Sequence, residues 1–284
     1  MMKTNPISTP TLRTHFVLAL FSLVMIYPIL WWVGAAFKSN AEMSSPSLFP
    51  TEWLWSNFSQ GWVAIPKFTF THFYLNTFEL IAGVLITSVL SCSLVAFGFA
   101  RLDFPLKNVW FAILMVTLML PSQVTLVPQY IMFNSWGWIN TYLPFYIPHS
   151  LAGGIGGPFF IFLLVQFIRG IPRELDESAK MDGCNWLGIY FRIVLPLTKP
   201  ALVTVAIYCF LWNWDDFFGQ LLYINSVSKY TVGLALKLFV DSQSALPWGQ
   251  LLAMSLVSII PSLILFFMAQ RHFVDGIASG AVKG

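Results

Sequence analysis

The sequence predicts an all-α membrane protein with six transmembrane helices and both termini in the cytoplasm. Three observations indicate this fold class. Hydrophobic residues make up 57% of the 284 positions and charged residues only 10%, whereas a soluble domain carries about 25% charged residues. Six predominantly apolar segments have about the 20 residues that a transmembrane helix needs. Lysine and arginine are concentrated in the segments that this arrangement places on one side of the membrane.

The first apolar segment covers residues 16–37. It exceeds the roughly 7–15 residues of a signal-peptide core and no clear A-x-A cleavage site follows, so we expect a retained helix, kinked near Pro28. Residues 38–75 form a loop rich in tryptophan and proline, expected at the outer surface. The second segment covers residues 76–100, where Asn76 can cap the helix while Glu79 reaches back to it. Alternatively, Glu79 contacts a substrate.

The third and fourth segments contain helix-bending residues. Residues 109–133 include Pro121 and Pro128, which bend a helix but are tolerated in a membrane when neighbours satisfy the backbone. The fourth segment, residues 151–168, begins with a glycine-rich turn at 153–157. This turn lacks the Lys-Ser/Thr ending of a phosphate-binding loop. We therefore interpret it as a source of flexibility or of close helix packing.

The last two segments complete the predicted topology. The fifth covers residues 201–222 and the sixth residues 250–270, with an outer loop between them and a small polar tail after them. Eleven of the fifteen Lys and Arg residues fall on the predicted inner side. Four fall on the outer side: Lys38, Lys67, Lys229 and Lys237. The asymmetry places both termini and the loop between the fourth and fifth helices in the cytoplasm.

That inner loop, residues 173–200, is the only long polar stretch between two strongly apolar segments. It contains four of the twelve acidic residues: Glu174, Asp176, Glu177 and Asp182. A loop so charged cannot lie in lipid. Gly170 can end the preceding helix in a left-handed conformation, and acidic residues favour a short helix after it. Gly183 can end that short helix, and Asn185 can cap a second one.

The spacing in this loop resembles a known motif. Glu177-Ser178-Ala179, three further residues, Gly183, nine further residues and Ile193-Val194-Leu195-Pro196 resemble the EAA motif of ATP-binding-cassette (ABC) importer permeases. That motif reads E-A-A, three residues, G, nine residues, I-x-L-P. Ser178 stands where the family usually has Ala, and serine is equally small.

Three further blocks resemble the MalG-type permeases of the carbohydrate-uptake group. They are residues 95–105, 120–128 and the tail from Gln270 to Gly284, which reads Q-R-H-F-V-D-G and ends in G-A-V-K-G. The resemblance divides the chain into an N-terminal tail, first helix and outer loop at 1–71, a transmembrane core at 72–271 and a cytoplasmic tail at 272–284. Within the core, the EAA loop occupies residues 169–200.

The resemblance implies the partners and the role of the loop. Such a permease pairs with a second, MalF-like permease in a bacterial or archaeal inner membrane, and an external binding protein delivers a sugar or a similar solute such as glycerol phosphate. Two separate ATPase subunits bind ATP and Mg²⁺, so this chain needs no cofactor and is not an enzyme. The residues implied in coupling to the ATPase are Glu174, Glu177, Ser178, Ala179, Asp182, Gly183, Leu195 and Pro196.

A second candidate site is the polar and aromatic cluster in the fifth segment, which resembles the family's W-x-W-N-D-F segment, with Asp215 where Asn is common. Aromatic faces suit sugar rings and carboxylates suit hydroxyl groups, but an interfacial aromatic belt at a helix end is the alternative interpretation. The candidates for a translocation path are Glu79, Trp212, Asn213, Trp214, Asp215 and Asp216.

Two other functions compete with that of an importer subunit. A stand-alone secondary transporter favours ionisable residues in mid-span, whereas Glu79, Asp215 and Asp216 lie near the predicted outer ends. An intramembrane enzyme needs a convergent catalytic or metal-binding set, and the four histidines and three cysteines are scattered. We therefore interpret the cysteines as packing residues. No Walker A motif occurs, so the energy must come from a partner, and nothing indicates nucleic-acid binding.

Overall fold

The computed structural model describes residues 12–241 and 247–281, and every regular element in these two ranges is a helix. The chain forms two compact units. The first extends to Thr69 and includes Leu238–Ile259, and the second covers Phe70–Lys237 and resumes at Ile260. The helices of the first unit are α1 (Leu12–Ala35), the short η1 (Asn40–Ser44), α2 (Ser56–Trp62) and α14 (Trp248–Ser258).

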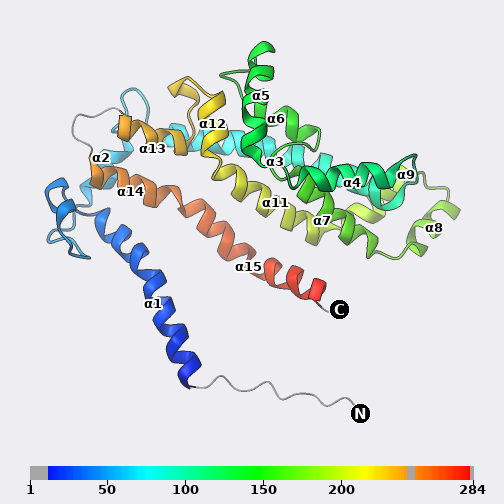
Figure 1. Ribbon diagram of the computed structural model, residues 1–284, viewed down its shortest axis with the longest axis horizontal. Coiled ribbons are helices and arrows are strands. Elements are labelled where there is room, and N and C mark those ends of the chain that lie inside the picture. Colours follow the sequence, from blue (N-terminus) through cyan, green and yellow to red (C-terminus); the bar gives the residue numbers. More distant parts are fainter. Residues whose placement is uncertain (1–11, 242–246, 282–284) are drawn as a thin grey trace. The chain divides into compact units, whose positions relative to one another are not determined.

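The second unit contains the remaining helices (Figure 1), and α13 runs across its boundary. They are α3 (Phe70–Arg101), α4 (Lys107–Thr117), α5 (Ser122–Ser135), α6 (Leu143–Ser150), α7 (Gly157–Arg169), α8 (Glu174–Met181), α9 (Trp186–Ile189), the π-helical η2 (Tyr190–Val194), α10 (Leu195–Leu197), α11 (Lys199–Trp214), α12 (Phe217–Tyr223), η3 (Val227–Lys229), α13 (Val232–Asp241) and α15 (Ile260–Ala281).

In the first unit, aromatic residues pack around the end of α1. The ring of Phe37 lies 5.0 Å from Trp53, 4.7 Å from Trp55 and 5.0 Å from Phe58. The buried side-chain amide of Asn57 donates to the carbonyls of Ala36 and Lys38, each at 3.0 Å. These contacts fold the segment predicted as an outer loop against the end of the first helix.

The core of the second unit is built on α3. Buried residues recur every fourth position along this helix: Leu80, Val84, Ser88, Cys92, Ala96 and Ala100. This spacing places each of them about one turn from the next, in a continuous stripe that winds slowly around the helix, and α6, α7 and α11 pack against α3. Cys92 and Cys209 are buried free thiols, and Cys184 is partly buried. The interpretation of the cysteines as packing residues is therefore confirmed.

The predicted start of the second transmembrane helix is wrong. α3 begins at Phe70, because Phe70 and Phe73 are both buried in the core and extend the apolar face toward the N-terminus. Asn76 consequently lies inside the helix and caps nothing. Its side-chain amide instead donates to the carbonyls of Ser228 and Tyr230, both at 2.9 Å. Glu79 is therefore no part of a capping box.

The third segment is broken rather than one continuous helix, and the fourth begins with turns, as predicted. Pro121 adopts an extended conformation before α5, because proline fixes its own φ and lacks the N–H that would continue α4. Residues 151–156 form turns that separate α6 from α7. A proline tolerated inside a helix, as Pro28 is in α1, cannot be told by sequence alone from one that ends a helix.

Three helices in the described residues are long and apolar enough to cross a membrane: Arg13–Ala35, Phe70–Arg101 and Trp248–Gln270. A fourth is present if Trp186–Leu197 and Lys199–Trp214, which meet at 76°, are taken as one broken span. Lys107–Thr117 and Gly157–Arg169 are shorter apolar helices. Pro196 and Pro200 flank the bend at Thr198, where each proline removes a backbone donor.

Candidate functional site

The short helix α8 lies at one end of the second unit, between α7 and α9 (Figure 1). Its first turn carries Glu174, Asp176 and Glu177 and its last turn carries Lys180, an order that complements the helix dipole. Gly183 follows with a φ of 80°, a conformation that favours glycine. These features confirm that the acidic stretch forms a short helix ended by Gly183.

The signals on either side of α8 gave one correct and one wrong prediction. Asn185 caps α9, since its side-chain oxygen accepts a hydrogen bond from the backbone N–H of Gly188 at 2.8 Å. Gly170 ends α7 in a right-handed conformation, with a φ of −75°. The left-handed ending predicted there is wrong, because Ile171 turns inward to the core instead of leaving the helix through a glycine turn.

The inner face of α8 is anchored to α3 by a buried ion pair. Asp176, which is 4% exposed, forms an ion pair with the guanidinium of Arg101, with Nε and Oδ2 2.8 Å apart. Arg101 also donates from Nη2 to the carbonyl of Ile171 at 2.8 Å. A single side chain at the end of α3 thus holds both the start of α8 and the segment before it. Sequence reasoning did not place either residue among the site residues.

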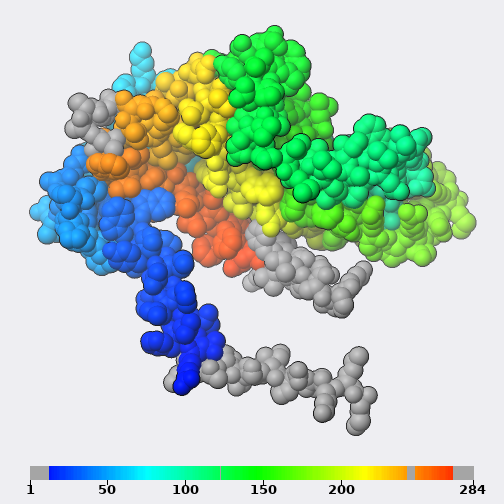
Figure 2. Space-filling view, viewed as in Figure 1, coloured from blue at the N-terminus to red at the C-terminus, as the bar shows by residue number. Residues whose placement is uncertain are grey.

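The outer face of α8 combines acidic and apolar side chains. Leu175 is 42% exposed and Met181 is 87% exposed, and they lie on the same side as the predicted residues Glu174, Glu177, Ser178 and Asp182, all exposed. Figure 2 shows this segment standing out at one end of the second unit. Leu175 and Met181 were missed; helical spacing would have indicated Met181, which lies far around the helix from the buried Asp176, but not Leu175, which is one turn before the buried Ala179.

Two small residues of the EAA-like motif lie on different faces of α8. Ala179 is buried against the core, so its small side chain allows α8 to pack closely on its own chain. Ser178 is exposed and its hydroxyl donates to the carbonyl of Glu174 at 2.8 Å. Because that hydroxyl is already satisfied within the helix, serine fits the outer face as well as the usual alanine does.

The segment after Gly183 packs on α3 through aromatic side chains. The hydroxyl groups of Tyr190 and Ser93 are 2.6 Å apart, and the ring of Phe97 lies 5.2 Å from Tyr190 and 6.2 Å from Trp186. The ammonium of Lys180, from α8, lies 3.7 Å from the centre of the Trp186 ring. The π-helical η2 then leads through Leu195 and Pro196 into the 76° bend before α11. α8 therefore contacts α9, and η2 and α10 connect α9 to α11 along the chain.

In the second candidate site, three members make internal contacts. Trp212 stacks on Phe160 with ring centres 5.4 Å apart. Asn213 is buried and its amide donates to the carbonyl of Cys209 at 2.8 Å. Trp214 stacks on Phe210 at 5.3 Å. These contacts fit a packing role for the three side chains, and their place in a translocation path stays a prediction.

The acidic members of that site differ in their surroundings. Asp216 caps α12, because its carboxylate accepts from the backbone N–H of Gly219 at 2.9 Å. Burial raises the pKa of Asp216, and the hydrogen bond from Gly219 opposes the rise. Asp215 and Glu79 are exposed, and the backbone carbonyl of Glu79 accepts a bond from the hydroxyl of Tyr146 at 3.2 Å. Their part in a translocation path stays a prediction.

The glycine-rich turn before α7 packs closely, as one of the two interpretations proposed. Gly156 has a φ of 78°, and a Cβ added there would lie 2.4 Å from the indole of Trp212. At Gly157 an added Cβ would lie 2.2 Å from the carbonyl oxygen of Ala152. The turn therefore lets the start of α7 approach the end of α11.

We expect Gly156→Ala to lower the free energy of unfolding by roughly 2–4 kcal/mol, from a left-handed alanine plus a steric clash in a packed core. Gly137→Ala is the matched control, because Gly137 has a φ of 70° but nothing within 4 Å of an added Cβ. Thermal unfolding in detergent measures the stability of both variants. Equal destabilisation by the two substitutions would contradict the close-packing interpretation.

No group of three or more His, Cys, Asp or Glu side chains within the described residues is arranged to hold a metal ion. The end of the block that resembles the family's G-A-V-K-G tail, residues 282–284, lies outside the described residues, as do residues 1–11 at the other end.

Comparison with known proteins places this architecture in a family. Residues 92–278 match the model of the binding-protein-dependent transport system inner membrane component. The chain is 34% identical to the probable ABC transporter permease protein YurM of Bacillus subtilis, over 94% of this chain and 87% of that protein. It is 27% identical to the trehalose/maltose transport system permease protein MalG of Thermococcus litoralis, over 93% of this chain and 94% of that protein.

A solved structure shows the same fold. It is the crystal structure of a bacterial ABC transporter involved in the import of the acidic polysaccharide alginate, with a TM-score of 0.79 and 22% sequence identity, covering 92% of this chain and 95% of that one. The family match spans more than half of the chain and includes the complete EAA-like segment. The chain is therefore a member of the family of inner membrane components of binding-protein-dependent ABC transport systems.

Proposed function

We propose that this chain is one of two permease subunits of an importer for a sugar or a similar solute, and that separate ATPase subunits drive it by binding the outer face of α8. The observation that carries the proposal is α8 itself: a short exposed helix, acidic and apolar outside, fixed to the transmembrane core by a buried ion pair. Family membership has already set aside the alternative of a stand-alone secondary transporter.

The proposed substrate class comes from the relatives. The names of similar permeases refer to arabinooligosaccharides, to trehalose and maltose, and to melibiose, raffinose and stachyose. A second solved structure, with a TM-score of 0.60, is an alginate transporter in complex with a pentasaccharide-bound periplasmic protein. By analogy, an external binding protein delivers the solute to this chain and to a second, MalF-like permease.

The proposed topology keeps the six crossings and the cytoplasmic termini. The crossings are α1, α3, the broken α4–α5 pair, α7 with the turn before it, α11, and α14 with α15. Broken helices are tolerated at membrane depth where neighbouring helices satisfy the backbone. Residues 72–271 then form the translocating core in the inner membrane, and α8 lies in the cytoplasm with the rest of the EAA loop at 169–200.

In the proposed mechanism, this chain transmits movement and performs no chemistry. The ATPase subunits bind ATP and Mg²⁺ and close on each other. Glu174, Glu177 and Asp182 accept charge-assisted hydrogen bonds from them, while Leu175 and Met181 fill an apolar recess. α8 is paired with Arg101 on α3, and the chain continues from it through η2 to the bend before α11. Displacement of α8 therefore moves α3 and α11 together, and this movement opens the solute path to the other side of the membrane.

Co-purification from detergent-solubilised native membranes tests this proposal. We expect the wild type to bring down an ATPase and a second permease, and Glu177→Lys to lose the ATPase while keeping the permease. Gly183→Pro should do the same, since proline cannot adopt the φ of 80° found at Gly183. If the wild type is recovered alone and transports in liposomes without ATP, the proposed function is wrong.

The two aspartates after α11 should separate a role in transport from a role in folding. Asp215→Asn should reduce transport several-fold without changing the melting temperature, because Asp215 is exposed. Asp216→Ala should cost about 1 kcal/mol of stability, the usual loss when an N-cap is removed, whereas Asp216→Asn should keep the cap. Normal transport by Asp215→Asn would remove Asp215 from the translocation path.

A further inference from the structure

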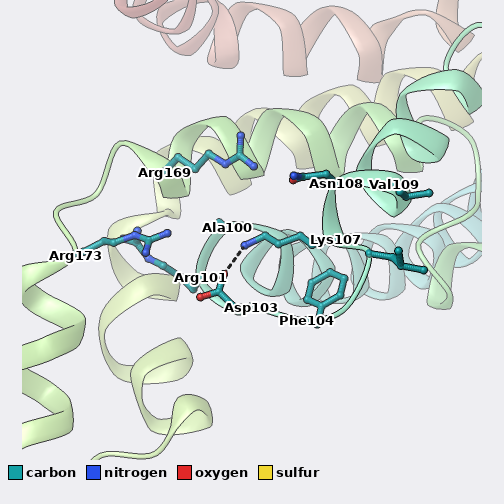
Figure 3. A pocket seen from close by; sticks show the side chains of 10 residues that line it. Ala100, Arg101, Asp103, Phe104, Lys107, Asn108, Val109, Arg169 and Arg173 are labelled. Atoms are coloured by element: carbon teal, nitrogen blue, oxygen red, sulfur yellow. Dashed lines mark hydrogen bonds and ion pairs between the residues drawn. The ribbon is translucent and has the colours of Figure 1, made fainter.

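A basic cavity lies beside the coupling region, where residues 100–109 meet residues 169–173 (Figure 3). Its volume is about 640 Å³, and it is lined by the end of α3, the loop to α4 and the start of α4, together with Arg169 at the end of α7 and Arg173 just before α8. Four cationic side chains border it: Arg101, Lys107, Arg169 and Arg173. In Figure 3, Lys107 and Arg173 extend into the same space from opposite sides, with Arg169 near them.

Only part of this positive charge is balanced by the chain. Arg101 is paired with Asp176, and the ammonium of Lys107 lies 3.5 Å from the exposed Asp103, the one acidic residue that lines the cavity. Among the described residues, neither Arg169 nor Arg173 has a carboxylate within ion-pairing distance. The cavity therefore keeps a net charge of about two positive charges, and it favours an anion.

The rim of the cavity is apolar on the side of α4. Phe104, Leu106 and Val109 line it and are exposed, as is the neighbouring Trp110, at 53%. Exposed tryptophans at the end of an apolar helix are typical of the membrane interface. A free phosphate ion would use the cations alone, whereas a phospholipid would use both the cations and the apolar rim.

We propose that this cavity binds the phosphate headgroup of an anionic phospholipid, with the acyl chains lying along the exposed face of α4. Basic pockets between transmembrane helices on the cytoplasmic side are suited to such headgroups. Arg101, Asp103 and Arg173 also line a second cavity, of about 470 Å³, that reaches Glu177 and Lys180 on α8. A bound lipid therefore contacts the same arginines that position the coupling helix.

Native mass spectrometry of the full transporter, titrated with phosphatidylglycerol or phosphatidylcholine, tests the proposal. We expect selective retention of phosphatidylglycerol, and an affinity about tenfold or more weaker in the double variant Lys107→Gln/Arg169→Gln, since each cation near a membrane surface contributes roughly a fivefold effect. Arg169→Lys should keep the lipid. The matched control is Arg192→Gln/Lys199→Gln, which removes two exposed cations outside the cavity and should also keep it.

Two results would overturn the proposal. One is equal phosphatidylglycerol retention by the Lys107→Gln/Arg169→Gln variant and its control. The other is displacement of the lipid by millimolar inorganic phosphate, because the cavity would then be a site for the free ion. The readout is retained lipid and not ATPase binding or transport, and it can be repeated on the permease alone, so its failure is distinguishable from failure of the proposed ATPase docking.

Discussion

Replacing Asp176 with alanine should destabilise the chain by about 3–5 kcal/mol, because it leaves the guanidinium of Arg101 buried without its partner. The side chains of the pair are 2% and 6% exposed, so water cannot substitute for the carboxylate. Thermal unfolding of the purified protein should show the loss. Asp182→Ala is the control, since it removes an exposed carboxylate from the same short segment and should change stability by at most ~0.5 kcal/mol.

The same pair should matter for coupling as well as for stability. The double variant Arg101→Leu/Asp176→Leu removes both charges, and replacing a buried ion pair by apolar residues is often neutral or stabilising. We expect it to recover most of the stability lost in Asp176→Ala but not ATP-driven transport, because the hydrogen bond from Arg101 to Ile171 is also gone. Full transport by the double variant would show that the anchor serves folding alone.

Placing charge on the apolar part of the α8 surface should have the second large effect. Leu175→Asp/Met181→Asp should reduce ATPase retention by at least tenfold, since each side chain buried at an interface contributes roughly 1.5–3 kcal/mol. Both side chains are exposed within the chain, so the melting temperature of the permease should not fall. The measurement is co-purification of the ATPase in a salt series.

Leu187→Asp/Phe191→Asp provides the matched control for this experiment. Leu187 and Phe191 are 61% and 56% exposed and lie beyond Gly183, in α9 and η2. The control should retain the ATPase if recognition is confined to α8. Equal loss in both double variants would mean that ATPase binding depends on general hydrophobicity of the loop and not on the α8 face.

Local signals accounted for most of what the sequence predicted correctly. The acidic turn, Gly183 and Asn185 act within a few residues, so they define α8 and α9 without reference to the rest of the fold. The prediction of a membrane protein needed only the composition of the chain, which likewise requires no knowledge of the fold. The spacing of the EAA-like motif then added the role of the loop, which no local rule supplies.

Features that depend on contacts between residues far apart in the chain could not be predicted from the sequence. The pairing of Arg101 with Asp176 joins two helices far apart in the chain, and each residue alone has an ordinary local explanation, as a helix-end cation and a first-turn acid. Asn76 looked like a helix cap because its true partners, the carbonyls of Ser228 and Tyr230, lie much later in the sequence. Pro121 lies at a break between two helices and Pro28 lies inside one, a difference that local propensity does not determine.

Cysteine cross-linking at Met181 tests most directly whether α8 contacts the ATPase. The variant would carry Met181→Cys in a chain whose Cys92, Cys184 and Cys209 are alanine, with Ser150→Cys, exposed at the end of α6, as the control position. In native membranes treated with a short thiol-to-amine reagent, we predict a product between Met181→Cys and the ATPase subunit, and none from Ser150→Cys. No ATPase product from Met181→Cys, or equal products from both positions, would contradict the assignment of α8 as the coupling helix.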